Sequence, residues 1–312
     1  MEKLLIIGSG CAGLTAGIYG ARSNAAPLIL SGLTPGGQLM LTTEVENFPG
    51  FENPVMGPDL MEAMRKQAKR LGVRFIDERV DKVDFSLKSG GFKVWTSEGR
   101  EVEASCVIVA TGANAKWLGI ESEKRLMGKG VSACATCDGF FFKGKRIVVV
   151  GGGDTAFEEA TFLTNFASQV TLIHRREGFR ASAAMLEKAR KNPKIAFVLN
   201  VTVDEVLGKD SVEGVMLKNV KTGEQQRLEC NGFFVAIGHE PVTGFLKGHV
   251  ELDDIGYIRP KAGAVVETSV PGVFAAGDCV DRRYRQAVTA AGLGCMAAIE
   301  ARTYLEHKQL IN

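Results

Sequence analysis

The chain opens with Leu4-Leu5-Ile6-Ile7-Gly8-Ser9-Gly10-Cys11-Ala12-Gly13, an apolar run followed by glycines in the spacing GxGxxG. Leu14, Ile18 and Ala21 then recur at helical intervals, so the pattern predicts a strand, a glycine turn and a helix. In this motif the first glycine allows a tight turn, the second lets the backbone approach a pyrophosphate, and the third lets the helix pack on the strand. We therefore predict a dinucleotide site at the helix N-terminus, built on Gly8, Gly10, Cys11, Ala12 and Gly13.

The acidic residue that usually binds a ribose hydroxyl is absent from its expected place. It should follow the next predicted strand, residues 27–30, about 20 residues after the glycines. Ser31-Gly32 stands there instead. We expect the ribose contact to come from elsewhere, and the nearest candidate is the loop of residues 33–38, whose Gly36 and Gly37 allow close backbone approach. A plain surface turn is the alternative interpretation of this loop.

A second fingerprint, Gly151-Gly152-Gly153-Asp154-Thr155-Ala156, follows the apolar run of residues 146–150 and opens a helix predicted from 154 to about 166. Two fingerprints so far apart indicate two copies of one nucleotide-binding fold. After the next predicted strand, residues 170–173, come His174, Arg175 and Arg176, with Arg180 beyond. Guanidinium groups at this position would pair with a 2′-phosphate, which predicts NADPH in preference to NADH. A solvated basic face is the alternative.

Between the fingerprints stands Cys134-Ala135-Thr136-Cys137-Asp138-Gly139. Two cysteines separated by two residues can close a disulfide, and each lowers the pKa of the other, so that one can attack as a thiolate. Half of a zinc site is the alternative, but the other cysteines stand alone and offer no second ligand pair. We therefore favour redox chemistry beside a nicotinamide. Asp138 is either a turn residue or a proton relay for the reacting thiol.

Composition limits the class of protein. The 312 residues exceed one typical hydrophobic core, which favours two domains. Lys and Arg number 38 against 36 Asp and Glu, so a net charge of +2 gives no general attraction to nucleic acid or membranes. No apolar run reaches the length of a membrane span, and residues 4–7 are too short for a signal peptide. The 7 cysteines, mostly isolated, are typical of a reducing compartment and predict a cytoplasmic protein.

The remaining segments complete an alternating α/β pattern. A helix is predicted over residues 57–72, followed by an antiparallel accessory sheet of strands at 73–76, 82–85, 91–96 and 102–104. A buried strand from Cys106 then ends at Thr111-Gly112. Residues 201–230 predict a second small sheet with turns at Gly208, Gly214 and Gly223, and the apolar strand of residues 232–239, which contains Ile237, ends in the same way.

The last part of the chain predicts a strand that breaks at Gly277-Asp278, and then a long helix over residues 286–307. Asp278 is either a turn or capping residue, or a carboxylate that holds a ribityl or ribose hydroxyl.

Together these motifs resemble the low-molecular-weight thioredoxin reductases, flavoproteins with two dinucleotide-binding domains. The resemblance spans essentially the whole chain and includes Gly36-Gly37-Gln38, the segment TEVENFPG at residues 43–50, and Asp278 followed by Tyr284-Arg285-Gln286-Ala287. The chain departs from the family at Cys11, where proline is frequent, but the glycines are intact.

The resemblance implies an α/β fold of two Rossmann-like domains, each with a central parallel sheet and a small antiparallel accessory sheet. Residues 1–112 and 244–312 would bind FAD, and residues 113–243 would form an inserted NADPH domain that carries the dithiol. By the same resemblance FAD lies at the first fingerprint, Gly36 to Gln38, Asn47, Asp278, Arg285, Gln286 and Ala287, and NADPH lies at Gly151, Gly153, Asp154, Thr155, Ala156, Arg175, Arg176 and Arg180. The other expected cofactor-binding positions are Ser31, Thr111, Gly112, His174, Ile237 and Gly277.

The implied reaction passes electrons from NADPH to FAD, then to a Cys134–Cys137 disulfide, and on to thioredoxin by thiol–disulfide exchange. The resemblance makes Cys137 the flavin-proximal thiol and Cys134 the exchanging one, in a cytoplasmic homodimer without a metal. Two alternatives remain: a flavin-dependent dithiol oxidase, and a non-catalytic redox sensor that signals to a partner protein.

Overall fold

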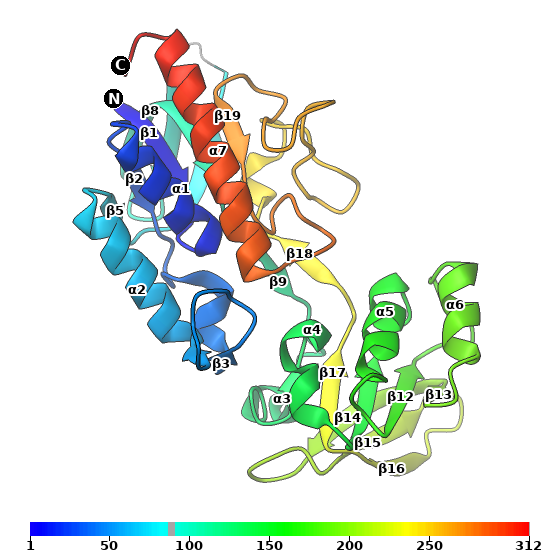
Figure 1. The fold of residues 1–312 in the computed structure, drawn as a ribbon. Coiled ribbons are helices and arrows are strands. Elements are labelled where there is room, and N and C mark those ends of the chain that lie inside the picture. Colours follow the sequence, from blue (N-terminus) through cyan, green and yellow to red (C-terminus); the bar gives the residue numbers. More distant parts are fainter. Residues whose placement is uncertain (87–90, 312) are drawn as a thin grey trace. The chain divides into compact units, whose positions relative to one another are not determined.

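The structure is a computed structural model, and it describes residues 1–86 and 91–311. The chain divides into two compact units, Met1–Asn114 with Glu240–Asn312, and Ala115–His239 (Figure 1). The predicted domain boundaries lie within four residues of these divisions. Two short strands, β9 (Ala113–Ala115) and β18 (His239–Pro241), pair with each other where the chain passes between the units. The predicted α/β fold class is confirmed.

The first unit is built on a sheet of seven strands. Its parallel part has the order β5-β2-β1-β8, with β19 also parallel to β8, while β7 and β6 continue it in antiparallel fashion. The bounds are β1 Glu2–Ile7, β2 Leu28–Leu30, β5 Arg74–Ile76, β6 Val80–Asp84, β7 Phe92–Thr96, β8 Glu101–Val109 and β19 Val273–Ala275.

Strand β8 corrects the prediction for residues 102–112. The sequence suggested an accessory strand at 102–104 and a separate buried strand from Cys106, but the structure contains one continuous strand. Its first residues pair with β7, and residues 104–109 pair with β1, because no glycine or proline interrupts the backbone between them. The accessory strands β6 and β7 therefore extend the central sheet of this unit. The prediction that residues 73–76 belong to the antiparallel accessory sheet is wrong, because β5 pairs in parallel with β2.

Helices α1 (Cys11–Arg22), α2 (Gly57–Arg70) and α7 (Ala287–His307) cover one face of this sheet, where they bury Leu14, Ile29, Ile108 and Ala297 among others. Figure 1 shows α7 lying along α1. Close packing of these two helices requires Gly294, because a Cβ at that position would lie 2.2 Å from Ala12 O. The remaining short elements are η1 Gly37–Leu41, β3 Glu44–Val45, β4 Val55–Met56 and η3 Gly244–Leu246.

The second unit has a parallel sheet in the order β10-β17-β11-β12-β13 and a separate antiparallel sheet, β14-β15-β16. The strands are β10 Val131–Ser132, β11 Arg146–Val150, β12 Gln169–His174, β13 Ile195–Leu199, β14 Val201–Leu207, β15 Gly214–Asn219, β16 Gln225–Glu229 and β17 Gly232–Val235. The helical segments are α3 Glu121–Arg125, α4 Ala135–Asp138, η2 Gly139–Phe142, α5 Asp154–Leu163 and α6 Ala183–Arg190.

Two details of this unit differ from the prediction. Gly214 was expected in a turn but begins β15, because its extended backbone pairs with Glu229 while the turn closes earlier, between Leu207 and Glu213. Helix α5 ends at Leu163 instead of residue 166, where the Thr164 hydroxyl bonds back to Thr161 O at 2.6 Å. Within residues 1–86 and 91–311, no helix is both long and apolar enough to cross a membrane.

Candidate functional site

The first glycine turn joins β1 to α1, and its geometry accounts for the glycines. Gly8 has φ +110°, and a Cβ there would lie 2.2 Å from Ala110 O, so only glycine fits. A Cβ at Gly13 would lie 1.9 Å from Gly8 O, which explains how closely the helix approaches the turn. Gly10 differs, because a Cβ there would meet no atom within 4 Å. The turn is therefore closed on the protein side and open at Gly10, where α1 begins without a side-chain cap.

The loop that contains Gly36 and Gly37 lies beside this turn. The Ser9 hydroxyl donates to Ser31 O at 3.0 Å and accepts the Gly36 N–H at 3.1 Å. A Cβ at Gly37 would lie 3.5 Å from Gly10 Cα. The predicted residues Gly10, Ser31, Gly36 and Gly37 are thus brought together around the opening of α1.

Three predicted residues with amide side chains lie further along the same unit. The Gln38 amide donates to Asn114 Oδ1 at 2.9 Å, and the Asn47 amide donates to Gln286 Oε1 at 3.2 Å. Gln286 also caps α7 through a reciprocal pair of bonds with Thr289. Asn47 and Gln286, which are distant in sequence, are therefore neighbours in the fold.

Asp278 follows β19 and is half-buried. Burial and the charge of Asp281 raise its pKa to about 6, against the opposing effect of Arg285. Gly277 has φ +80°, and a Cβ there would lie 2.9 Å from Ala12 Cβ, which places Asp278 close to the start of α1. The predicted pair Thr111-Gly112 follows β8, which pairs in parallel with β19. Thr111-Gly112 and Asp278 therefore lie at the same edge of the sheet.

The loop after Asp278 is held by Asp281, a residue that the sequence analysis missed. Its carboxylate accepts the backbone N–H groups of Arg283, Tyr284 and Arg285 at 2.9, 2.8 and 3.1 Å. Arg285 has φ +48°, a left-handed conformation that is uncommon for a residue other than glycine. The sequence signal that could have identified it is an aspartate in the short segment between a predicted strand and the next helix, because an Asp side chain there often accepts the backbone N–H groups of the following turn.

Cys11 is inert in this setting. Burial raises the pKa of its thiol to about 12, with a further contribution from Asp278. Its S–H group points to Met61 Sδ at 3.7 Å. The departure from proline at this position leaves the turn intact.

The second glycine turn, between β11 and α5, repeats the first. A Cβ at Gly151 would lie 2.4 Å from Ala236 O and 2.6 Å from Ala156 Cβ, whereas a Cβ at Gly153 would meet nothing within 4 Å. Gly152 packs against the ring of His174, where a Cβ would lie 2.3 Å from Cε1. Asp154, Thr155 and Ala156 form the first turn of α5, beside the open side of Gly153. Asp154 Oδ1 also accepts the Ser182 N–H at 2.8 Å.

The basic residues cluster beside this turn. The backbone N–H of Arg180 donates to Gly152 O at 2.8 Å, and the His174 ring stacks on Phe179 with centroids 5.2 Å apart. Burial lowers the pKa of His174, and the charges of Arg175 and Arg176 lower it further. Arg175, Arg176 and Arg180 are exposed, and none forms an ion pair within the described ranges. Ile237 packs against an apolar cluster of the same unit.

Cys134 and Cys137 form a disulfide with an S–S distance of 2.06 Å and a Cα–Cα distance of 5.3 Å. Cys134 is the N-cap of α4, a short helix that the sequence analysis did not predict. Asp138 ends this helix, and its N–H donates to Cys134 O at 3.1 Å. Burial raises the pKa of the Asp138 carboxyl, while a hydrogen bond from Ser132 opposes the shift. Asp138 is thus a helical residue beside the disulfide.

Two aromatic side chains are exposed next to the disulfide. Phe140 and Phe141, in η2 directly after α4, are 59% and 39% exposed. Exposed phenylalanines side by side are unusual on a protein surface unless a partner covers them. The cysteines are occupied by their disulfide, and across the described ranges no group of three or more His, Cys, Asp or Glu side chains could hold a metal ion.

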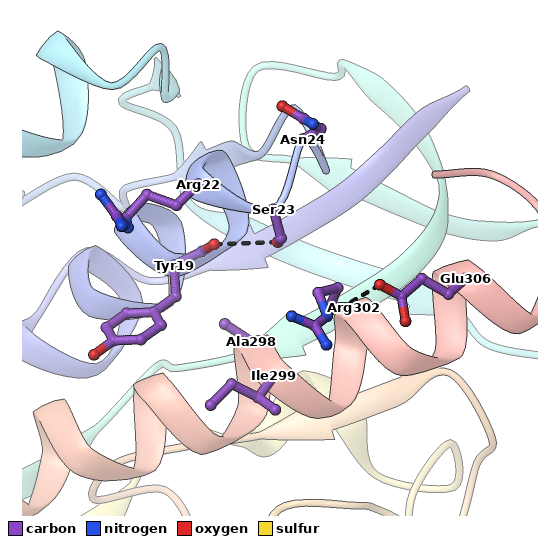
Figure 2. A pocket seen from close by; sticks show the side chains of 8 residues that line it. All are labelled: Tyr19, Arg22, Ser23, Asn24, Ala298, Ile299, Arg302 and Glu306. Carbon is purple, nitrogen blue, oxygen red and sulfur yellow. Dashed lines mark hydrogen bonds and ion pairs between the residues drawn. The ribbon is translucent and has the colours of Figure 1, made fainter. Parts of the chain in front are cut away.

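A pocket also lies in the first unit, between the end of α1 and α7 (Figure 2). Arg302 pairs with Glu306 at 3.1 Å, and the Ser23 hydroxyl donates to Tyr19 O at 3.1 Å. None of the predicted site residues lines it; its residues are Tyr19, Arg22, Ser23, Asn24, Ala298, Ile299, Arg302 and Glu306.

Two glycine turns of dinucleotide-binding type and a disulfide on one of the two units define a nucleotide-dependent disulfide oxidoreductase. In agreement, residues 2–294 match the family described as Pyridine nucleotide-disulphide oxidoreductase. The thioredoxin reductase of Rickettsia felis is 55% identical over 97% of this chain and 98% of that protein, and the thioredoxin reductase of Mycolicibacterium smegmatis is 52% identical over 98% and 97%. The chain belongs to the thioredoxin reductase family.

Solved structures agree with this assignment. A thioredoxin reductase from Giardia duodenalis covers 97% of this chain and 98% of its own, with a TM-score of 0.93 at 44% identity. The Lactococcus lactis thioredoxin reductase described as the FR conformation covers 98% and 100%, with a TM-score of 0.65 at 38% identity.

Proposed function

We propose that this chain is an NADPH-dependent thioredoxin-disulfide reductase. The observation that carries the proposal is the Cys134–Cys137 disulfide at the start of α4, in a chain whose relatives are thioredoxin reductases. Enzymes of this family use FAD and NADPH. When bound, NADPH supplies a hydride, and FAD passes the two electrons on to a disulfide.

The residues of the first unit fit a flavin dinucleotide. The pyrophosphate would bind at the open side of Gly10, at the uncapped start of α1. Gly37 lies next to Gly10 at this position. Asp278 and the neighbours Asn47 and Gln286 would hold the flavin part. The complete set on this site is Gly8, Gly10, Cys11, Ala12, Gly13, Ser31, Gly36, Gly37, Gln38, Asn47, Thr111, Gly112, Gly277, Asp278, Arg285, Gln286 and Ala287.

The residues of the second unit fit NADPH. The open side of Gly153 at the start of α5 would receive its pyrophosphate, and the exposed guanidinium groups of Arg175, Arg176 and Arg180 would pair with the 2′-phosphate. Gly151, Asp154, Thr155, Ala156, His174 and Ile237 complete this assignment.

The dithiol performs the exchange with the protein substrate. Two electrons cleave the Cys134–Cys137 bond, and the Cys134 thiolate attacks the thioredoxin disulfide to form a mixed disulfide. The Cys137 thiolate then attacks Cys134, which restores the internal disulfide and releases thioredoxin as a dithiol. Asp138, whose pKa is raised by burial, would hold the proton that one leaving sulfur requires. Phe140 and Phe141 offer the apolar surface on which thioredoxin would dock.

The test is steady-state NADPH consumption with oxidised thioredoxin, in the unmodified chain and in Cys134→Ser and Cys137→Ser. Each variant should lose thioredoxin reduction while NADPH still bleaches the flavin absorbance, because flavin reduction precedes the dithiol. Asp138→Asn should slow turnover by about 100-fold, the scale of general acid catalysis. Normal turnover in either serine variant would refute the relay.

The same assay separates the alternatives. A dithiol oxidase would reoxidise with oxygen and ignore NADPH, and a sensor would bind NADPH without continuous turnover. Arg175, Arg176 and Arg180 form no ion pair with any residue that the structure describes, and they support the reductase, since a dithiol oxidase has no need of a 2′-phosphate site.

We also assign the chain to a homodimer. Helix α7 carries no charged residue between Ala287 and Ile299, yet Val288, Met296 and Ile299 are 43%, 48% and 45% exposed. A helix that is apolar on all sides is normally covered. Met296→Glu should lower the molar mass measured by light scattering to that of one chain, whereas Glu300→Gln should leave it unchanged.

The cytoplasm is the proposed compartment. Burial raises the pKa of Cys11, Cys106, Cys230 and Cys279, and all four remain thiols. Such unpaired thiols are typical of a reducing environment.

A further inference from the structure

An acidic side chain lies beside the position where the first nucleotide-binding fold has Ser31-Gly32 in place of a ribose ligand. Strand β5 pairs with β2 in parallel, and Leu30 is opposite Ile76. This pairing continues past the strand ends, because the Ser31 N–H donates to Ile76 O at 2.8 Å. Asp77 therefore stands next to Ser31 at the carboxyl edge of the sheet, which is the edge where nucleotides bind.

Asp77 is fixed by Arg65 of α2. Arg65 Nη2 donates to both oxygens of the Asp77 carboxylate, at 2.9 and 3.1 Å, and Nη1 lies 3.4 Å from Ser31 Oγ. The guanidinium also lies 4.4 Å from the centre of the Phe75 ring. The Arg65 side chain is 16% exposed and the Asp77 side chain 53% exposed. The carboxylate is thus held in one orientation while part of it faces solvent.

The Asp77 carboxylate can accept a further hydrogen bond. A carboxylate offers about four lone-pair positions, Arg65 donates to one on each oxygen, and the side chain is 53% exposed. Burial alone would raise the pKa of Asp77, but the hydrogen bonds from Arg65 and Ser31 and the charges of Arg65 and Lys69 hold it below its ordinary value. The group is therefore an ionised acceptor at neutral pH.

Ser31 connects this acid to the glycine turn. The Gly8 N–H donates to Leu30 O at 2.8 Å, and the Ser9 hydroxyl donates to Ser31 O at 3.0 Å. A dinucleotide with its pyrophosphate at Gly10 would therefore place its adenosine ribose at the end of β2, which is the end that Ser31 and Asp77 occupy.

We propose that Asp77 is the ribose ligand of the first site, where it accepts a hydrogen bond from a ribose hydroxyl of the adenosine half of FAD, and that Arg65 is its positioning residue. The inference rests on the proposed binding of FAD. It assigns to β5 the role that the second strand has in other dinucleotide folds.

The test compares two flavins on the full chain after removal of its own flavin, with affinity measured by quenching of flavin fluorescence. One is FAD, and the other is an FAD whose adenosine ribose lacks both the 2′- and 3′-hydroxyls. The unmodified chain should bind the dideoxy flavin about 10-fold or more weakly, as expected for a lost bond to a charged group. In Asp77→Ala this difference should vanish, so that both flavins bind equally.

Further variants identify the role of each residue. Arg65→Met should reduce the discrimination between the flavins, and Arg65→Lys should restore part of it. Glu62→Ala, which removes an exposed acid of the same helix, should leave it unchanged. Should Asp77→Ala fold poorly, Asp77→Asn serves instead and should narrow the difference, because a neutral amide is the weaker acceptor.

Two results would overturn the proposal. In the first, the unmodified chain binds both flavins equally; in the second, the Asp77 variants weaken both flavins by the same factor and preserve the difference, which would make Asp77 a structural residue only. Either result leaves FAD binding intact. A chain that bound neither flavin would instead refute the proposed function and this inference with it.

Discussion

The pKa values of Asp77, Asp138 and Asp278 are shifted in different directions because their neighbours differ. Burial raises the pKa of Asp278 and of Asp138, and among the described residues no cation forms an ion pair with either carboxylate. Asp77 has such a cation, and its pKa lies below the ordinary value. At the scale of single residues, the sequence therefore identifies candidate acids, but their protonation depends on partners that only the fold supplies.

The raised pKa of Asp278 predicts a pH dependence of stability. The folded value of about 6 exceeds the ordinary value of 3.8, so the folded state keeps this proton to higher pH. Stability from this group is complete below about pH 4 and is lost as the pH rises through about 6, by roughly 3 kcal/mol in total. Urea unfolding of the flavin-free chain should show this loss, and Asp278→Asn should remove it. Asp210→Asn, at an exposed position, is the control. If the free energy of unfolding of Asp278→Asn changed with pH as in the unmodified chain, the pH dependence would not come from Asp278.

Coenzyme choice should depend on Arg175 and Arg176. Their joint replacement by alanine should lower kcat/KM for NADPH by about 10-fold or more for each lost charge-assisted bond, and should leave kcat/KM for NADH nearly unchanged. Stopped-flow bleaching of the flavin with each coenzyme measures the ratio. Arg190→Ala, an exposed arginine of α6, should keep the NADPH preference. Equal efficiency of the two coenzymes in the unmodified chain would contradict the prediction.

At the scale of elements, local patterns predicted most of the structure. Residues 146–150 and 195–199 form the expected strands, and the long helix begins within one residue of its predicted start because Gln286 caps it. The patterns failed where pairing between distant segments decides the outcome. Strand β8 is a single strand although its two ends pair with different strands, and Asp77 reaches Ser31 only through the register of β5 with β2. Such registers are tertiary information.

The contact between α1 and α7 predicts opposite effects at two glycines of one helix. A Cβ at Gly294 would lie 2.2 Å from Ala12 O, so Gly294→Ala should push the helices apart and destabilise the first unit by about 1–3 kcal/mol. Gly292 is exposed in the single chain, and a Cβ there meets nothing within 4 Å. In the Met296→Glu background, where the proposed dimer face stays uncovered, Gly292→Ala should therefore stabilise by about 0.5–1 kcal/mol through helix propensity. Thermal unfolding of the two variants measures both changes of stability. A stabilising effect of Gly294→Ala would show that α1 and α7 can move apart without loss of stability.

At the scale of the whole molecule, the chain order separates the parts of one reaction. The first glycine turn belongs to the unit formed by Met1–Asn114 and Glu240–Asn312, while the second turn and the disulfide share the inserted unit. A nicotinamide and the disulfide must each approach one flavin, and hydride transfer requires contact within about 3–3.5 Å. If both use the same face of the flavin, they cannot occupy it together.

We therefore expect a rigid-body movement of the inserted unit, which also exposes the dithiol to a substrate as large as thioredoxin. The hinges should be residues 112–116 and 238–243, which include Gly112 at φ +72° and Gly238 at φ +104° and can absorb the dihedral change.

A cleavable crosslink that holds the disulfide at the flavin tests the movement. The locked chain should still exchange electrons between dithiol and flavin, because these groups remain in contact, but it should stop reducing thioredoxin in the steady state. Cleavage of the crosslink should restore turnover, which excludes damage to the site as the cause. A crosslink of the same length confined to one unit should have no effect. Turnover of the locked chain at the unlocked rate would mean that the nicotinamide and the dithiol use opposite faces of the flavin, and that thioredoxin reaches Cys134 without any movement of the units.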